Sequence, residues 1–326
     1  MENKSLLDIR DLEIRYLTDE GTVHAVNGFN LKLEKGETLG LIGETGAGKT
    51  TVALGILRLV PNPPGKITGG EIWLDGRELT GASEKEMRSI RGNKVSMIFQ
   101  DPMTSLNPVI PVRDQVAEVI LLHEKIPASA ALAKAEDALA KVGINRDRVK
   151  EYPHQFSGGM RQRVVIAMAL ACNPMLLIAD EPTTALDVTV QAQVLQLMRD
   201  LKTEYDTSMI LITHDLGIVA DICDKVAIMY AGSIVEQSEK HELFKNPKHP
   251  YTIGLFNSLP DVHSDVDNLR PIKGLMPDPR CLPTGCPFHP RCEDVMPECT
   301  LKAPPQTAIT DTHFVRCHKC AREVSR

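Results

Sequence analysis

Residues 38–51 read TLGLIGETGAGKTT, in which an apolar strand pattern runs into a glycine-rich turn and then into the start of a helix. Gly43 to Thr50 fit the pattern G-x-x-x-x-G-K-[ST]. Glycines at these positions let backbone N–H groups turn inward around a phosphate, and the helix N-terminus adds a positive field. We expect Lys49 to reach the β- and γ-phosphates of a nucleotide and the Thr50 hydroxyl to bind Mg²⁺. The alternative is a glycine-rich turn that matches by chance, and the flanking strand and helix argue against it.

A second strand pattern, which ends in acidic residues, supplies the other half of such a site. Residues 175–181 read MLLIADE. We expect Asp180 to hold Mg²⁺ through water and Glu181 to polarise the water that attacks the γ-phosphate. The two motifs together predict an ATP or GTP site, but they do not choose among the families that carry a phosphate loop.

The chain divides into zones of different pattern. Residues 1 to about 100 are rich in strand patterns, with turns expected at Asp19–Gly21, Lys35–Gly36 and Gly69–Gly70. Residues from about 101 to 165 carry apolar residues at helical spacing, and those from about 166 to 240 alternate strands and helices, as in a parallel sheet. The last zone, from about 241 to 326, is rich in proline and cysteine. One large α/β domain with an appendage is therefore predicted.

Composition narrows the class of protein. Of the 326 residues, 42% are hydrophobic and 25% are charged, which is ordinary for a globular chain with a sizeable core. The net charge of −6 gives no support to bulk binding of nucleic-acid phosphates. The N-terminus has no signal pattern, and the longest apolar run, Val164–Cys172, is far shorter than the roughly 20 residues of a membrane-spanning helix. We expect a chain that does not span a membrane by itself.

The segment that distinguishes among phosphate-loop families is residues 156–163, FSGGMRQR, just ahead of a helical pattern. Here the chain resembles the ABC ATPase family, whose signature reads LSGGQ. The central Ser157, Gly158 and Gly159 are intact, and the ends read Phe156 and Met160. A hydroxyl and closely spaced N–H groups at a helix start form an anion site, and the resemblance implies that it binds the γ-phosphate held by a facing subunit. Without the other motifs, a plain helix cap and turn would be the first interpretation.

Further marks of the family occur in order along the chain. Gln100, in IFQDP, resembles the Q-loop glutamine, which implies contact with Mg²⁺ or the attacking water. Ala185-Leu186-Asp187 resembles the D-loop, and His214 resembles the switch histidine, which implies that it steadies the transition state. Tyr16 lies where the family stacks an aromatic ring on adenine, although a strand tyrosine that packs on its neighbours is a nearly equal alternative.

The resemblance covers about residues 5 to 240 and implies both the fold and the site. The implied fold is α/β, with a RecA-like P-loop core, an antiparallel β subdomain, a helical signature subdomain at about 101–165 and a small cysteine-rich C-terminal extension. The implied domains are an ATP-binding domain, residues 1–240, and the extension, residues 241–326. The implied ATP-binding residues are Tyr16, Gly43, Glu44, Thr45, Gly46, Ala47, Gly48, Lys49, Thr50 and Thr51. Implied catalytic residues are Glu181, His214 and Gln100; implied Mg²⁺ ligands are Thr50, Gln100 and Asp180; implied contacts to the ATP of a facing subunit are Ser157, Gly158, Gly159 and Asp187.

The last zone narrows the resemblance. Residues 246–252 (NPKHPYT) and 285–292 (GCPFHPRC) resemble the C-terminal extension of dipeptide and oligopeptide importer ATPases, in which four cysteines hold a [4Fe–4S] cluster. The matching positions here are Cys286, Cys292, Cys299 and Cys317. A tail with few apolar side chains cannot by burial alone offset a backbone ordering cost of about 1–2 kcal/mol per residue, whereas a metal centre could. Zinc, favoured by Cys317-His318-Lys319-Cys320, and thiols without a metal are the alternatives.

The resemblance therefore implies an ATPase that powers an importer of dipeptides or oligopeptides, with nickel or another small solute as the alternative cargo. It also implies a second ABC ATPase subunit, in a heterodimer or a homodimer, two transmembrane permease subunits and an extracytoplasmic substrate-binding protein. The expected location is peripheral, on the cytoplasmic face of the cell membrane. An exporter ATPase and a soluble ABC-type DNA-maintenance ATPase are further alternatives. Against the latter, no extended Lys/Arg stripe occurs, and we expect no nucleic-acid partner.

Overall fold

The computed structural model describes residues 5–184, 186–258 and 272–324. The chain forms two compact units, and each is assembled from separate stretches of sequence. The first unit consists of Met1–Leu6, Leu33–Thr38 and Gly81–Thr213, and the second of Leu7–Lys32, Leu39–Thr80 and His214–Arg326. The phosphate loop thus belongs to the second unit, whereas the signature and the acidic strand belong to the first.

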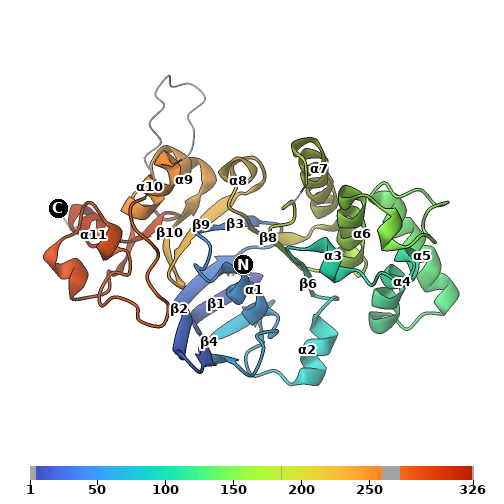
Figure 1. Ribbon diagram of the computed structural model, residues 1–326, viewed down its shortest axis with the longest axis horizontal. Helices are drawn as coiled ribbons and strands as arrows, with labels where there is room; N and C mark the ends of the chain where they lie inside the picture. Colours follow the sequence, from blue (N-terminus) through green and yellow to red (C-terminus); the bar gives the residue numbers. More distant parts are fainter. Residues whose placement is uncertain (1–4, 185, 259–271, 325–326) are drawn as a thin grey trace. The chain divides into compact units, whose positions relative to one another are not determined.

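A parallel sheet runs through the first unit (Figure 1). Strands β6 (Val95–Ile98), β7 (Leu176–Asp180) and β8 (Ser208–Ile212) are paired in that order, with Ile98 opposite Ala179 and Asp180 opposite Ile212. Every residue of β7 and β8 is buried, as expected for strands covered on both faces. Because the carboxyl ends of parallel strands share one edge, the residues that follow β6 and β7 emerge close together.

The first unit also contains several helices. They are α2 (Glu84–Ile90), α3 (Pro102–Ser105), α4 (Val112–His123), α5 (Ala128–Lys141), α6 (Gly158–Leu170) and α7 (Val188–Tyr205), with a short 3-10 turn η1 (Pro153–Gln155). In α5 the buried residues are Ala131, Ala135 and Leu139, which recur every four positions. They form one packed face of the helix, so the helical spacing predicted within residues 101 to 165 is confirmed for this segment.

The second unit contains an antiparallel sheet in the order β2–β1–β4–β5. These strands are β1 (Leu7–Thr18), β2 (Gly21–Leu33), β4 (Gly65–Leu74) and β5 (Arg77–Glu78). The turn expected at Gly69–Gly70 is wrong, because both glycines lie inside β4, near a break in the register of β1 between Arg10 and Glu13. Gly70 has a φ of 83°, and a Cβ there would lie 2.4 Å from the carbonyl oxygen of Asp11. The glycine therefore makes room for a β-bulge rather than a turn.

The phosphate loop is carried by a second ladder of strands in this unit. Strand β3 (Thr38–Ile42) pairs in parallel with β9 (Lys225–Tyr230), which is followed by antiparallel β10 (Ser233–Glu239), β12 (Phe314–Arg316) and β11 (Gln306–Ala308). The helices are α1 (Lys49–Ile56), α8 (Leu216–Ile222), α9 (Lys240–Lys245), α10 (Pro250–Asn257) and α11 (His318–Val324), with 3-10 turns η2 (His289–Arg291) and η3 (Pro297–Thr300). Strands β11 and β12 have three residues each. They are too short to show an alternating pattern, and the sequence did not predict them.

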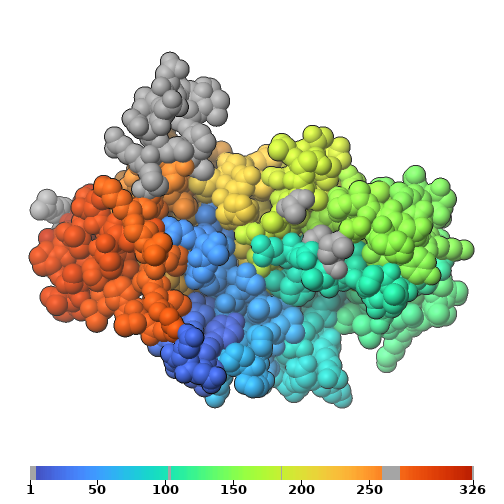
Figure 2. Space-filling view, in the orientation of Figure 1, coloured from blue at the N-terminus to red at the C-terminus, as the bar shows by residue number. Residues whose placement is uncertain are grey.

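The segment from residue 272 onward packs against the N-terminal strands of the same unit, as the orange and blue surfaces show (Figure 2). The backbone N–H of His24 donates to the carbonyl oxygen of Pro279 at 2.8 Å. Deeper in the unit, His313 Nε2 lies 2.8 Å from Glu236 Oε1, and both side chains are fully buried. The tail is thus an integral part of this unit. Within the described residues, no helix combines the length and the apolar character that crossing a bilayer requires.

Candidate nucleotide and cysteine sites

The glycine-rich loop lies where the sequence predicted it, between β3 and α1. Gly48 is the N-cap of α1 and has a φ of 102°. A Cβ on Gly48 would lie 2.4 Å from the carbonyl oxygen of Ala25, and one on Gly43 would lie 2.3 Å from that of Met229. Only glycine fits at both positions, so the backbone can curve tightly beneath the helix N-terminus. Such a curve turns successive N–H groups toward an anion.

Lys49 begins α1 and folds back over the loop. Its Nζ donates to the carbonyl oxygens of Gly43 at 2.7 Å and of Glu44 at 3.0 Å, and only 9% of the residue is exposed. An ammonium group beside a helix N-terminus makes a strongly positive site for phosphate oxygens. Thr50 and Thr51 follow in the first turn of α1, and the hydroxyl of Thr50 is the kind of hard oxygen ligand that Mg²⁺ prefers.

In the first unit, Gln100 follows β6 and Glu181 follows β7, so both leave the same edge of the sheet. Gln100 Nε2 donates to Glu181 Oε2 at 2.9 Å, and Thr184 Oγ1 donates to the same oxygen at 3.0 Å. Glu181 has a φ of 47°, a left-handed conformation that few non-glycine residues adopt. Asp180, directly before it, is 3% exposed. The sequence predicted Gln100 and Glu181 but not Thr184, because a threonine in a turn carries no distinguishing signal.

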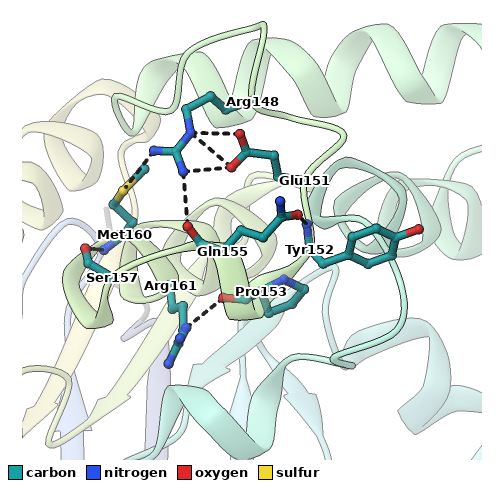
Figure 3. Close-up of polar contacts among 8 residues, drawn as sticks. All are labelled: Arg148, Glu151, Tyr152, Pro153, Gln155, Ser157, Met160 and Arg161. Atoms are coloured by element: carbon teal, nitrogen blue, oxygen red, sulfur yellow. Dashed lines mark hydrogen bonds and ion pairs between the residues drawn. The ribbon is translucent and has the colours of Figure 1, made fainter.

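The signature segment forms the start of α6 (Figure 3). Ser157 is the N-cap, and its Oγ accepts a hydrogen bond from the Met160 N–H at 3.4 Å. A Cβ on Gly159 would lie 2.3 Å from Cγ1 of Val190 in α7, whereas the nearest neighbour of a Cβ on Gly158 would be 3.6 Å away. Gly159 therefore allows α6 to pack closely on α7. Ser157 and Gly158 are exposed and leave the helix start open to an anion.

Arg148 organises the turn that leads into the signature (Figure 3). Its guanidinium pairs with Glu151 through Nη2 at 2.7 Å, and this hydrogen bond lowers the pKa of Glu151. The same Nη2 donates to the carbonyl oxygen of Gln155 at 3.1 Å, and Nη1 lies 3.4 Å from the sulfur of Met160. The guanidinium carbon also sits 4.8 Å from the centre of the Phe156 ring. One side chain thus contacts both ends of the signature, where this sequence departs from LSGGQ, and nothing in the sequence singled it out.

The remaining predicted residues are distributed over both units. Asp187 Oδ1 accepts a hydrogen bond from the Val190 N–H at 2.9 Å and so caps α7. Ala185, the first residue of the D-loop match, lies outside the described residues. His214 follows β8 and is exposed. Tyr16 pairs with Gly65 across β1 and β4, and a Cβ on that glycine would lie 2.7 Å from Cε1 of the Tyr16 ring. This is the packing contact expected of a strand tyrosine.

Four cysteines from separate parts of the C-terminal extension line one small cavity, namely Cys286, Cys292, Cys299 and Cys317. These are the four predicted cluster ligands. Burial raises the pKa of Cys286 to about 11, and a hydrogen bond with Cys320 lowers the pKa of Cys317 to about 6. Across the part of the chain that the structure describes, however, no group of three or more His, Cys, Asp or Glu side chains is arranged to hold a metal ion.

This chain is similar to known proteins in both sequence and fold. A family profile described as "ABC transporter" matches residues 26–184, and one described as "Oligopeptide/dipeptide transporter, C-terminal region" matches residues 235–299. The oligopeptide transport ATP-binding protein OppD of Bacillus subtilis is 51% identical over 95% of this chain and 88% of its own. The dipeptide transport ATP-binding protein DppD of the same organism is 48% identical over 96% of this chain and 94% of its own. The ATP-binding cassette MJ0796, solved as a dimer in a post-hydrolysis state with ADP and phosphate, is 25% identical with a TM-score of 0.65, covering 72% of this chain and 98% of that one.

Proposed function

Because this chain belongs to the ABC transporter family of ATP-binding subunits, we propose that it hydrolyses ATP to power the import of oligopeptides or dipeptides. The observation that carries the proposal is the identity of 51% to an oligopeptide transport subunit over 95% of the chain. That identity is not confined to the ATP site, since residues 235–299 match the C-terminal region of oligopeptide and dipeptide transporters. An ATPase that powers transport of an unrelated cargo would match the ABC transporter profile, but it would have no reason to match the C-terminal region of oligopeptide and dipeptide transporters.

We infer that the phosphate loop and Lys49 bind the β- and γ-phosphates, and that Glu181 orients the water that attacks. Phosphoryl transfer needs positioning and charge more than covalent chemistry. The hydrogen bonds from Gln100 and Thr184 support this role, because they fix a Glu181 oxygen at the sheet edge. His214, which follows β8, would stabilise the transition state, and Tyr16 would stack on adenine.

The residues inferred to hold Mg²⁺ are Thr50, Gln100 and Asp180, and their oxygen atoms suit that ion. Bound Mg²⁺ would neutralise charge on the phosphates. We further infer that Ser157, Gly158, Gly159 and Asp187 contact the ATP of a facing ABC subunit, in a heterodimer or a homodimer. The exposure of Ser157 and Gly158 at a helix start supports this assignment. In this proposal residues 1–240 act as the ATPase, peripheral on the cytoplasmic face of the membrane, with two permease subunits and an extracytoplasmic substrate-binding protein.

We also infer that the extension, residues 241–326, holds a [4Fe–4S] cluster through Cys286, Cys292, Cys299 and Cys317. The support is the cavity that these thiols share and the preference of iron–sulfur clusters for four thiolates. A zinc ion, with Zn–S bonds of about 2.3 Å, would draw its ligands closer together than a four-iron cube does. The test is iron and sulfide analysis of anaerobically purified protein, with Cys281→Ser, an exposed cysteine, as the control for Cys286→Ser. Zinc without iron or sulfide would contradict the inference.

The function is tested on the complex co-purified with its permeases and reconstituted in liposomes with the binding protein. We expect uptake of a radiolabelled tripeptide that requires ATP, with no uptake of Ni²⁺. Glu181→Gln should retain ATP binding while phosphate release falls by orders of magnitude, since only the water-orienting group is changed. Nickel uptake, or normal turnover in Glu181→Gln, would refute the proposal.

A further inference from the structure

Arg291, a residue of the C-terminal extension, contacts the phosphate loop of the same unit. Its Nη1 donates to Glu44 Oε2 at 2.9 Å and its Nη2 donates to Glu44 Oε1 at 3.1 Å. Glu44 is the second residue of the loop. The Arg291 side chain is only 6% exposed and that of Glu44 is 28% exposed. The pair has the two-pronged geometry that gives an arginine–carboxylate contact both strength and a fixed direction.

The rest of the guanidinium is also held in place. Nε donates to the carbonyl oxygen of Lys273 at 3.1 Å. The guanidinium carbon lies 5.8 Å from the centre of the Tyr230 ring and 6.0 Å from that of Phe288. Contacts from three separate segments, at Lys273, Tyr230 and Phe288, therefore help to hold the guanidinium in place beside Glu44.

A second residue from beyond the nucleotide-binding strands holds the same peptide. The hydroxyl of Tyr251, in α10, accepts a hydrogen bond from the backbone N–H of Glu44 at 3.0 Å. Tyr251 is fully buried, and its ring lies 4.7 Å from that of Tyr230 and 5.4 Å from that of Phe288, centre to centre. Glu44 is thus fixed at its main chain by Tyr251 and at its carboxylate by Arg291.

These contacts bear on phosphate binding for two reasons. The carbonyl oxygen of Glu44 accepts a hydrogen bond from Lys49 Nζ, so the position of the Glu44 peptide helps to set the position of that ammonium group. Glu44 also brings a negative charge to a loop that must receive phosphates, and like charges at close range oppose binding. Arg291 offsets that charge.

We propose that Arg291 and Tyr251 are positioning residues of the ATP site, so that the C-terminal extension completes the phosphate loop of its own chain. The inference rests on the proposed role of that loop in ATP binding. Arg291 ends the 3-10 turn η2, directly before Cys292. A disordering of this turn would therefore displace Arg291 and, through its contact with Glu44, would disturb the phosphate loop.

The test measures ATP affinity by calorimetry, and the KM and kcat of phosphate release, on the full-length protein. We expect Arg291→Ala to weaken ATP binding by on the order of tenfold, because the half-buried Glu44 is left with an unpaired negative charge beside the phosphates. Glu44→Gln in the Arg291→Ala background should recover most of the loss, since the neutral amide does not repel phosphate. The matched control is Arg280→Ala, an exposed arginine of the same extension that pairs with Asp278.

Tyr251→Phe removes one oxygen from a buried ring and keeps the proposal testable if Arg291→Ala does not fold. We expect it to raise the KM for ATP several-fold while kcat stays within about twofold, a split that general destabilisation does not produce. Wild-type affinity in Arg291→Ala and Tyr251→Phe, with affinity lost in Lys49→Ala, would overturn this inference and leave the proposed function intact. Wild-type affinity in Lys49→Ala would instead remove the proposed function, and this inference with it.

Discussion

The two glycines of the signature should respond in opposite ways to the same substitution. Gly159→Ala places a Cβ 2.3 Å from Cγ1 of Val190, far inside van der Waals contact, whereas Gly158→Ala places one 3.6 Å from Leu186, an ordinary contact. Val190 lies in α7, where a β-branched side chain has one strongly preferred rotamer and cannot easily turn away. The clash must therefore be relieved by moving α6 relative to α7.

Overpacking of this kind costs about 1–3 kcal/mol. Alanine recovers a few tenths of a kcal/mol at a helix start, because it restricts the unfolded chain more than glycine does. The net prediction for Gly159→Ala is a loss of about 1–2 kcal/mol, and for Gly158→Ala no loss or a small gain. For a folding unit of 150–250 residues, 1 kcal/mol corresponds to a shift of about 2–4 °C in the melting temperature.

The assay is thermal unfolding followed by circular dichroism, with Val190→Ala as the suppressor. In the Val190→Ala background the partner of the clash is gone, so Gly159→Ala should cost less than about 0.5 kcal/mol, a non-additivity expected for touching residues. Equal melting temperatures for Gly158→Ala and Gly159→Ala would refute the reasoning. The reasoning would also be refuted if Gly159→Ala lowered the free energy of unfolding by the full amount in the Val190→Ala background.

Arg148→Ala should displace the signature and so lower ATP turnover by roughly tenfold, with ATP affinity unchanged. The control is Arg146→Ala, whose exposed side chain pairs with Asp137 and whose loss should leave turnover unchanged. Equal turnover in the two variants would contradict this prediction. Burial lowers the pKa of His249 from 6.5 to about 4, so this histidine binds a proton more weakly in the folded chain than in the unfolded chain. The free energy of unfolding should therefore fall by about 3 kcal/mol as the pH drops from 6.5 to 4. Denaturant titrations of His249→Asn, which keeps a helix cap, should lack that slope. Asp187→Ala should destabilise by about 1 kcal/mol through the lost cap of α7 while Asp187→Asn does not, and equal melting temperatures would exclude a capping role.

The sequence was informative wherever the chemistry fixes residue types at fixed spacing. The phosphate loop needs Gly43 and Gly48 because backbone atoms approach where a Cβ would be, and that need is visible as a motif. Glu181 was predicted because it ends an apolar strand pattern, and Gln100 was predicted from its resemblance to the Q-loop glutamine of the family. The four cysteines of the cavity were predicted from their resemblance to a known ligand set, and the structure gathers them around one cavity.

The sequence was uninformative where a contact depends on long-range packing. Arg148 and Thr184 serve the site through hydrogen bonds that any arginine or threonine could make in a suitable place, so their type carries no signal. Strand β12 forms by pairing with β10, and β11 forms by pairing with β12, so neither depends on a local alternation of apolar residues. The glycines of β4 were wrongly predicted to form a turn, because β-bulges and turns both favour glycine.

The two proposed phosphate contacts share one physical logic that explains this division. A helix N-terminus or a curved loop binds phosphate with backbone N–H groups, so the motif records only what lets the backbone curve: glycines, a capping serine and a lysine. The position of that backbone is set by side chains outside the motif. Arg148 contacts the signature at Phe156 and Met160, and Arg291 forms a hydrogen bond with Glu44 of the phosphate loop. In each case a guanidinium suits the task, because its planar set of donors can fix several neighbours at once. Neither arginine is proposed to touch the nucleotide. Substitutions at these two positions should therefore change the position of the phosphate-binding backbone while leaving in place the groups that contact phosphate.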